Sequence, residues 1–456
     1  MSEVKVNKIS PRTNCGTVTL GDSGDSFVIP SGATITNNGT QTGFGRTGTV
    51  DWQTSSIKTA TFTAANGEGY FANTSGGAFT MNLPAGTAGN IVSVVDYTNT
   101  FQTNALTIAP NGSQKLGGIN ASFVAGTEGQ SLTFVYVDDT EGWKNVQDST
   151  SNATGSLFMA ATGGTITTCG NDKIHTFTGP GTFAVSRLAQ CAANNVLSYV
   201  VVAGGGGGGI GDVSGGGGAG GFREVKSPAT PYTASPLDGY PSSPNRITAT
   251  VASFPIAVGG GGAAGATTPP GSNGTNGVNS TFSTITAAGG GGGSRGCASP
   301  PTSGSNGGSG GGAGYANSTV GSGNTPPTTP PQGQNGGGNA NPSTGPAYGA
   351  GGGGGAGAVG GNGSPSAGGV GGNGVASSIS GSSVTRSGGG GGARNDAAAG
   401  GAGGSGGGGI GGGNGSGHAA GNGTANTGGG GGGLDNDTPS GGTGGSGIVI
   451  IRYKFQ

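Results

Sequence analysis

Long glycine runs are the sequence feature that most restricts the folds open to this chain. They begin at Gly204 and recur as far as Gly447, broken mainly by alanine, serine, asparagine, valine and isoleucine. Glycine loses more backbone entropy on ordering than any other residue and offers no side chain to bury, so five or six in a row hold neither a helix nor an ordinary strand well. An ordered glycine run therefore needs neighbouring segments to bond its backbone N–H and C=O groups.

One extended conformation meets this requirement. A left-handed helix with three residues per turn rises about 3.1 Å per residue and makes no internal hydrogen bonds, so every backbone group is free to bond a neighbour. Without Cβ atoms, such helices approach closely enough to bond sideways in several directions. We therefore expect residues 204–446 to form a lattice of polyglycine II-type helices with almost no hydrophobic core.

Collagen, flexible linkers, phosphate-binding loops and RNA-binding repeats are also rich in glycine, but they fit this sequence less well. Collagen needs an unbroken Gly-X-Y repeat, and that period appears only at Gly271–Asn279. A flexible linker would not need the apolar strands that flank the glycine region, and G-x-G-x-x-G matches occur by chance without the strand-to-helix setting of a phosphate site. The arginines are too isolated for RNA-binding repeats; they are Arg223, Arg295, Arg386 and Arg394.

Charge and hydropathy exclude further classes of protein. The 456 residues include 17 basic and 18 acidic ones, so the chain has no basic footprint for nucleic acid. No apolar stretch approaches the roughly 18 residues of a membrane span, and the N-terminus lacks the apolar segment of a signal peptide. We expect neither a nucleic-acid partner nor membrane insertion.

Apolar segments flank the glycine region. Leu197–Ala203 runs straight into it and Gly447–Phe455 emerges from it. Both are rich in β-branched residues, so we expect them to share one sheet at the base of the glycine domain. The predicted organisation is a short-strand stem at 1–50, a small β-sandwich or barrel at 51–150, a basal β segment at 151–203, the lattice at 204–446 and a closing strand at 447–456.

The fold class expected is all-β N-terminal modules plus the glycine lattice, with little or no α-helix, because no 3.6-residue period appears. Alternation at Ser131–Val137 predicts a buried face of Leu132, Phe134 and Tyr136, and Trp143 is expected in the core or at an interface. The expected strands are Val4–Ile9, Thr17–Leu20, Ser26–Ile29, Ala33–Thr36, Lys58–Thr63, Gly69–Asn73, Phe79–Leu83, Asn90–Asp96, Ala105–Ile108, Ser131–Val137, Lys144–Gln147, Gly164–Cys169, Lys173–Thr178, Gly181–Val185, Thr248–Val258 and Thr281–Ala287. The first four, near the N-terminus, are each too short to make a core alone, so they need partners and predict an oligomeric stem.

Segments between the glycine runs have a different chemistry and are the candidate binding loops. Loops on a rigid scaffold commonly carry binding residues, and prolines stiffen Thr325–Pro331 so that little entropy is lost on binding. The alternative is that these segments are inert connectors. The candidate residues are Tyr232, Tyr240, Tyr315, Pro326, Pro327, Pro330, Pro331, Tyr348, Arg386, Arg394, His418, Asp435 and Asp437.

We expect no catalytic, metal or cofactor site. The close carboxylate pairs are Asp138 with Asp139 and Asp435 with Asp437, both in turn-like contexts, and His175 and His418 are the only histidines. The four cysteines lack metal-ligand spacing. Of these, Cys169 and Cys191 are expected to be small buried thiols, with pairing across two strands as the alternative.

Several motifs resemble a known family. Tyr199–Gly209, the Gly-Gly-Ala-Gly-Gly-Phe-Arg segment ending at Arg223, Ser280–Gly289 and Gly444–Tyr453 resemble the glycine-rich domain of bacteriophage tail-fibre and adhesin proteins. Lys8–Arg12 followed by Thr17–Pro30 is similar to the opening of marine phage fibre proteins.

The resemblance implies a structural virion protein, made in the host cytoplasm, whose polyglycine-helix sandwich displays loops to a host surface glycan or outer-membrane protein. It also implies a homotrimer that contacts other virion structural proteins through its N-terminal region. The module at 51–148 is not part of the best-understood adhesins, so mounting on tail or capsid stays open. The alternatives are a capsid or tail decoration protein without a receptor role and, third, an envelope glycan depolymerase.

Overall fold

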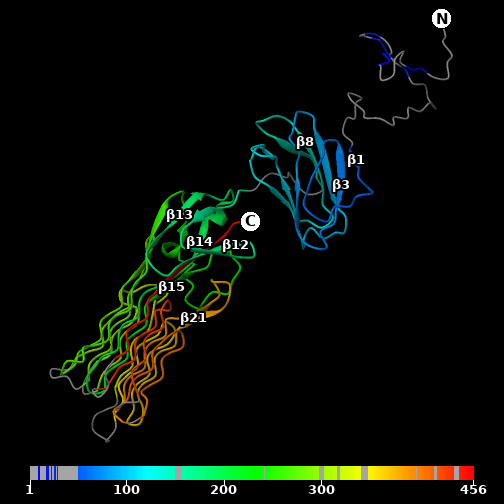
Figure 1. Ribbon diagram of the computed structural model, residues 1–456. Helices are drawn as coiled ribbons and strands as arrows, with labels where there is room; N and C mark the ends of the chain where they lie inside the picture. Colours follow the sequence, from blue (N-terminus) through cyan, green and yellow to red (C-terminus); the bar gives the residue numbers. More distant parts are fainter. Residues whose placement is uncertain are drawn as a thin grey trace. The chain divides into compact units, whose positions relative to one another are not determined.

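The computed structural model describes residues 50–148, 157–240, 242–296, 302–315, 319–339, 348–396, 398–414, 418–435 and 441–456, with a few positions among residues 9–28 (Figure 1). Its regular structure is almost entirely β, which confirms the all-β fold class. Over the described ranges, the helical segments are two 3-10 turns, η1 (Ala192–Asn195) and η2 (Ser243–Asn245). Of the four strands expected before residue 37, most residues lie outside the described ones, but Thr17, Val18 and Thr19 are described and are not in a strand.

The N-terminal module consists of two separate sheets, which favours the sandwich over the closed barrel. One has the strand order β1-β3-β5-β8-β9 and the other β2-β4-β6-β7. The strands are β1 (Asp51–Trp52), β2 (Phe62–Thr63), β3 (Glu68–Ala72), β4 (Phe79–Asn82), β5 (Ile91–Asp96), β6 (Leu106–Ala109), β7 (Phe123–Ala125), β8 (Ser131–Tyr136) and β9 (Trp143–Asp148). All seven strands expected here are present, whereas β1 and β7 were not expected.

Alternation along β8 sets its buried face. Leu132, Phe134 and Tyr136 are buried and the residues between them are half-buried, as the sequence predicts. Trp143 at the start of β9 is fully buried, so it is a core residue.

The glycine domain begins with two larger sheets. Their orders are β10-β13-β17-β18-β19 and β11-β12-β22-β14-β15, with β16 paired to β14 in addition, and β20 and β21 form a separate hairpin. The strands are β10 (Ala160–Thr162), β11 (Thr165–Cys169), β12 (Asp172–Phe177), β13 (Gly181–Arg187), β14 (Val196–Val202), β15 (Phe222–Val225), β16 (Ile247–Thr248), β17 (Ser253–Ala257), β18 (Ser280–Phe282), β19 (Ile285–Ala287), β20 (Val375–Ser377), β21 (Val384–Arg386) and β22 (Ile448–Lys454).

The two strands that flank the glycine region are direct neighbours. β14 pairs antiparallel with β22, with Val202 opposite Ile448, so the chain leaves the sheet and returns to it at the same place. Both strands are buried on both faces, which explains why they are mostly apolar rather than alternating. One face packs with Phe183 and Phe282 in the main core, and the other packs with Phe222 in a second cluster.

Four segments differ from the expectation. Thr248–Val258 is not one strand, because β16 pairs with β14 whereas β17 pairs with β13 in another sheet. Thr281–Ala287 is not one strand but the tight hairpin β18–β19, which turns at Ser283 with a positive φ of 53°. The stretch Val375–Ser387, expected as a loop, contains the hairpin β20–β21, and β15 opens the stretch Phe222–Asn245 that was also expected to be a loop.

Hydrogen bonds between the glycine runs repeat every three residues. In Gly204–Gly209 the first and fourth N–H groups donate to Val278 and Thr275, the second and fifth to Gly445 and Gly442, and the third and sixth to Gly218 and Gly215. The carbonyl oxygens of Gly204–Gly209 in turn accept N–H groups from three further runs. Each of these backbone groups is thus bonded by another run, which is how a buried glycine segment without a core satisfies its polar groups. Figure 1 shows these segments lying side by side beyond β14 and β15.

Candidate binding surface

The glycine runs reverse direction at two ends of their domain. One end adjoins β14, β15 and β22, and we call it the sheet end. We call the other the loop end; it comprises the described residues within 210–214, 266–271, 294–303, 314–320, 339–348, 364–367, 393–399, 413–418 and 434–441. Backbone bridges tie these reversals together, since Ile210 pairs with Ser272 and Leu434 while Arg394 pairs with Gly349 and Gly413.

A tyrosine pair lies at the loop end. The rings of Tyr315 and Tyr348 stack with centroids 4.2 Å apart and an interplanar angle of 29°. Both are half-buried and pack on a small cluster of Val213, Ala350 and Ala393. The Tyr315 N–H donates to the Val213 carbonyl at 2.9 Å, which fixes the backbone beneath the ring.

Beside the tyrosines lies an ion pair. Arg394 Nη2 is 2.5 Å from Asp396 Oδ2, and the two side chains are 21% and 35% exposed. Asn395 between them accepts the Tyr348 N–H on its Oδ1 at 2.8 Å and donates its own N–H to the Tyr348 carbonyl at 3.2 Å. The segment 394–396 therefore joins an aromatic pair, an amide and an ion pair, which are groups that bind polar ligands by stacking and hydrogen bonding.

The structure divides the sequence-predicted residues between the two ends. Tyr315, Tyr348, Arg394, His418 and Asp435 belong to the loop end, whereas Asp437 lies outside the described residues. His418 is half-buried and its carbonyl accepts the N–H of Gly413 at 3.0 Å. Asp435 is only 3% exposed, so it is not a surface group. Sequence reasoning missed Asp396 and Asn395, since only their spacing from Arg394 would have marked them.

The remaining predicted residues lie at the sheet end. The Gln332 carbonyl accepts the N–H of Phe222 at 2.8 Å, which places the proline loop against β15. Within that loop, Gln332 Nε2 donates to the Pro326 carbonyl at 2.8 Å. The sheet-end set is Tyr232, Tyr240, Pro326, Pro327, Pro330, Pro331 and Arg386. Arg386 is buried, with 5% of its surface exposed, and burial lowers its pKa.

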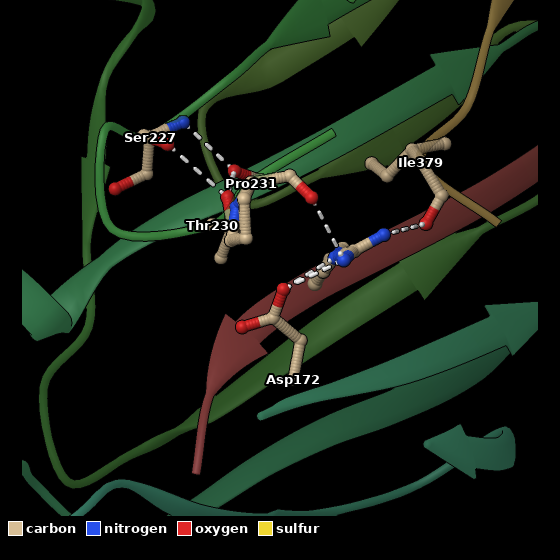
Figure 2. A network of polar contacts seen from close by, with 7 residues as sticks. Asp172, Ser227, Thr230, Pro231 and Ile379 are labelled. Carbon is tan, nitrogen blue, oxygen red and sulfur yellow. Dashed lines mark hydrogen bonds and ion pairs between the residues drawn. The ribbon is translucent and has the colours of Figure 1, made fainter. Parts of the chain in front are cut away.

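Tyr232 lies beside Arg452, which belongs to a buried polar network. Figure 2 shows that network. Arg452 from β22 forms an ion pair with Asp172, Nη2 to Oδ2 2.7 Å, and both side chains are almost fully buried. Arg452 also donates to the carbonyls of Pro231 and Ile379, at 3.2 and 3.4 Å, and lies 5.3 Å from the Tyr232 ring centroid. Figure 2 shows Asp172, Pro231 and Ile379 converging on one point from different segments. Tyr232 therefore helps to anchor loops to the closing strand.

The groups considered for catalysis are dispersed. His175 on β12 is buried, with Nδ1 2.7 Å from the Gly163 carbonyl oxygen and Nε2 3.3 Å from the Tyr453 hydroxyl, and burial lowers its pKa. Asp138 and Asp139 lie in an exposed turn after β8. Over the described ranges, no three His, Cys, Asp or Glu side chains gather as metal ligands, and no helix is long and apolar enough to span a membrane.

The cysteines differ from one expectation. Cys169 and Cys191 are free thiols, the first half-buried and the second exposed. The prediction that both would be buried is therefore wrong for Cys191, which precedes the short turn η1 at the surface.

Comparison with known proteins identifies the family of the glycine domain. A glycine-rich domain family matches residues 176–454, which include β13 to β22 and every described glycine run between them. No match was found among curated protein sequences. Since the family match spans more than half of the chain, the chain belongs to the glycine-rich domain family.

Proposed function

We propose that this protein is a structural virion protein of the phage tail-fibre or adhesin kind, and that it binds a receptor on the host cell surface through its loop end. One observation carries the proposal: Tyr315, Tyr348 and Arg394 come from different reversals of the glycine runs and gather at one end of the domain. Aromatic rings beside Asn, Asp and Arg form an adaptable recognition surface.

The glycine domain serves as a frame in this proposal. Its three-residue hydrogen-bond period supports a lattice of polyglycine II-type helices. A frame whose runs are joined by many backbone hydrogen bonds keeps the loops in place, which lowers the entropy lost when a receptor binds. Other virion proteins and the trimer contacts are assigned to the N-terminal region, and the receptor is a surface glycan or an outer-membrane protein.

The proposal is tested with a double variant, Tyr315→Ala with Tyr348→Ala. Loss of two central aromatic contacts should weaken binding of the purified protein to susceptible cells by more than about tenfold, measured by flow cytometry of labelled protein. Tyr97→Ala is the matched control, because Tyr97 is 52% exposed in the N-terminal module and should leave binding unchanged.

Two results would count against the receptor role. Unchanged cell binding by a folded double variant, and by a second variant with residues 339–348 exchanged, would remove the loop end from recognition. Tight association with virions without any binding to cells would instead support a capsid or tail decoration protein, and release of oligosaccharide from host envelope would support a depolymerase.

A further inference from the structure

Asparagine side chains cover the perimeter of the glycine runs. Eight of them accept, on Oδ1, a backbone N–H from an adjacent run, at distances of 2.7–3.0 Å. All but the half-buried Asn273 are exposed. They are Asn273, Asn276, Asn279, Asn306, Asn335, Asn362, Asn373 and Asn422.

The outer run 272–279 shows how such a residue is placed. Gly274 and Gly277 face inward, where a Cβ would overlap the carbonyl oxygens of Gly207 and Gly204. Asn273, Asn276 and Asn279 are three residues apart and face the run 289–295, whose N–H groups they accept. Glycine is thus present on the crowded face and asparagine on an open one.

Asn276 shows what the side chain replaces. Its Oδ1 accepts the N–H of Gly292 at 2.9 Å, while its Nδ2 donates to the carbonyl of Asn306 at 3.3 Å. The amide therefore bonds one donor and one acceptor on two neighbouring runs. A backbone peptide group of a further glycine run would make the same two bonds, so Asn276 takes the place of a missing run.

An uncovered perimeter would be hazardous for the same reason as an exposed β-sheet edge. Rows of unpaired N–H and C=O groups are templates for another chain, and native proteins block them with polar side chains. Glycine runs make this acute, because without Cβ atoms nothing else keeps a second backbone away. We propose that these asparagines protect the glycine domain from lateral association with the glycine runs of a second copy.

The test is a triple variant of the full chain, Asn276→Gly, Asn335→Gly and Asn373→Gly. Its matched control is Val278→Gly, Val359→Gly and Val370→Gly, which creates the same number of glycines at exposed positions whose side chains make no hydrogen bond. Sedimentation velocity over a wide range of protein concentration should show faster-sedimenting species for the asparagine variant, beyond those of the unaltered protein, and no such shift for the control.

Two further measurements keep the outcome decisive. If the triple variant does not fold, the three single variants are examined in the same way, and amide exchange at Gly292 should accelerate in Asn276→Gly alone. Folded asparagine variants that sediment like the unaltered protein at every concentration would overturn the proposal. A valine control that associates equally would overturn it too, because added glycine rather than the lost amide would then be the cause.

Discussion

Individual glycines differ in what they contribute, and the direction of the missing side chain decides it. Gly208 is buried, and a Cβ there would overlap the carbonyl oxygen of Gly432. Gly208→Ala should therefore destabilise the domain by about 1–3 kcal/mol, at the upper end because the obstructing atom is backbone and cannot rotate away. Urea unfolding of the full chain measures this.

Gly260 provides the control for that prediction. It is exposed, and no atom lies within 4 Å of where its Cβ would be. Gly260→Ala should change stability by no more than about 0.5 kcal/mol. Equal destabilisation by both substitutions would mean that loss of glycine flexibility, rather than backbone contact, limits the runs.

The lowered pKa of His175 predicts how the stability of the protein depends on pH. Burial lowers its pKa in the folded protein below the unfolded value of about 6.5. Below that pH the unfolded chain takes up a proton that the folded protein resists, so stability falls as the pH drops. Thermal unfolding of His175→Gln should lose part of this acid sensitivity, whereas His418→Gln should keep it; identical pH profiles for all three proteins would contradict the assignment.

At the scale of elements, strands with a clear pattern were predicted and strands without one were not. Alternation marked β8, and continuous β-branched residues marked β14 and β22. The hairpin β20–β21 was missed because Val375–Arg386 is short, rich in serine and flanked by glycine. The strand expected at Thr281–Ala287 is interrupted at Ser283, because a tight turn needs only one residue with a positive φ.

The Gly-X-Y period at Gly271–Asn279 has a physical cause in the packing of the runs. A run on the perimeter such as 272–279 has one crowded face, where every third residue is glycine, while Gly204–Gly209, bonded by other runs at every position, is glycine throughout. The period that collagen shares therefore marks an outer run. The sequence did not predict at which end of the domain each loop lies, because that assignment requires every reversal of the chain to be counted. The reversal at Asn306–Ser309 is easily missed, since it contains no proline or aromatic residue.

At the scale of the whole molecule, the glycine domain depends on the strand that closes its sheet, β22. β22 lies between β12 and β14, and its partners are more than 240 residues earlier in the chain. Ile448, Val449, Ile450, Ile451 and Tyr453 are all buried. Each such side chain stabilises the fold by roughly 1.5–3 kcal/mol, so together they match the 5–15 kcal/mol typical of a whole domain.

A chain that ends at Gly447 should therefore fail to form the glycine domain, whereas one that ends at Phe455 should fold, because Gln456 is exposed. Limited proteolysis measures the difference as rapid cleavage within residues 157–446. A synthetic peptide of residues 446–456 should restore resistance to the shorter chain, because it supplies the strand that both neighbours lack. If the shorter chain resists protease without the peptide, then the glycine runs hold each other without the sheet, and the frame is stabilised by backbone hydrogen bonds alone.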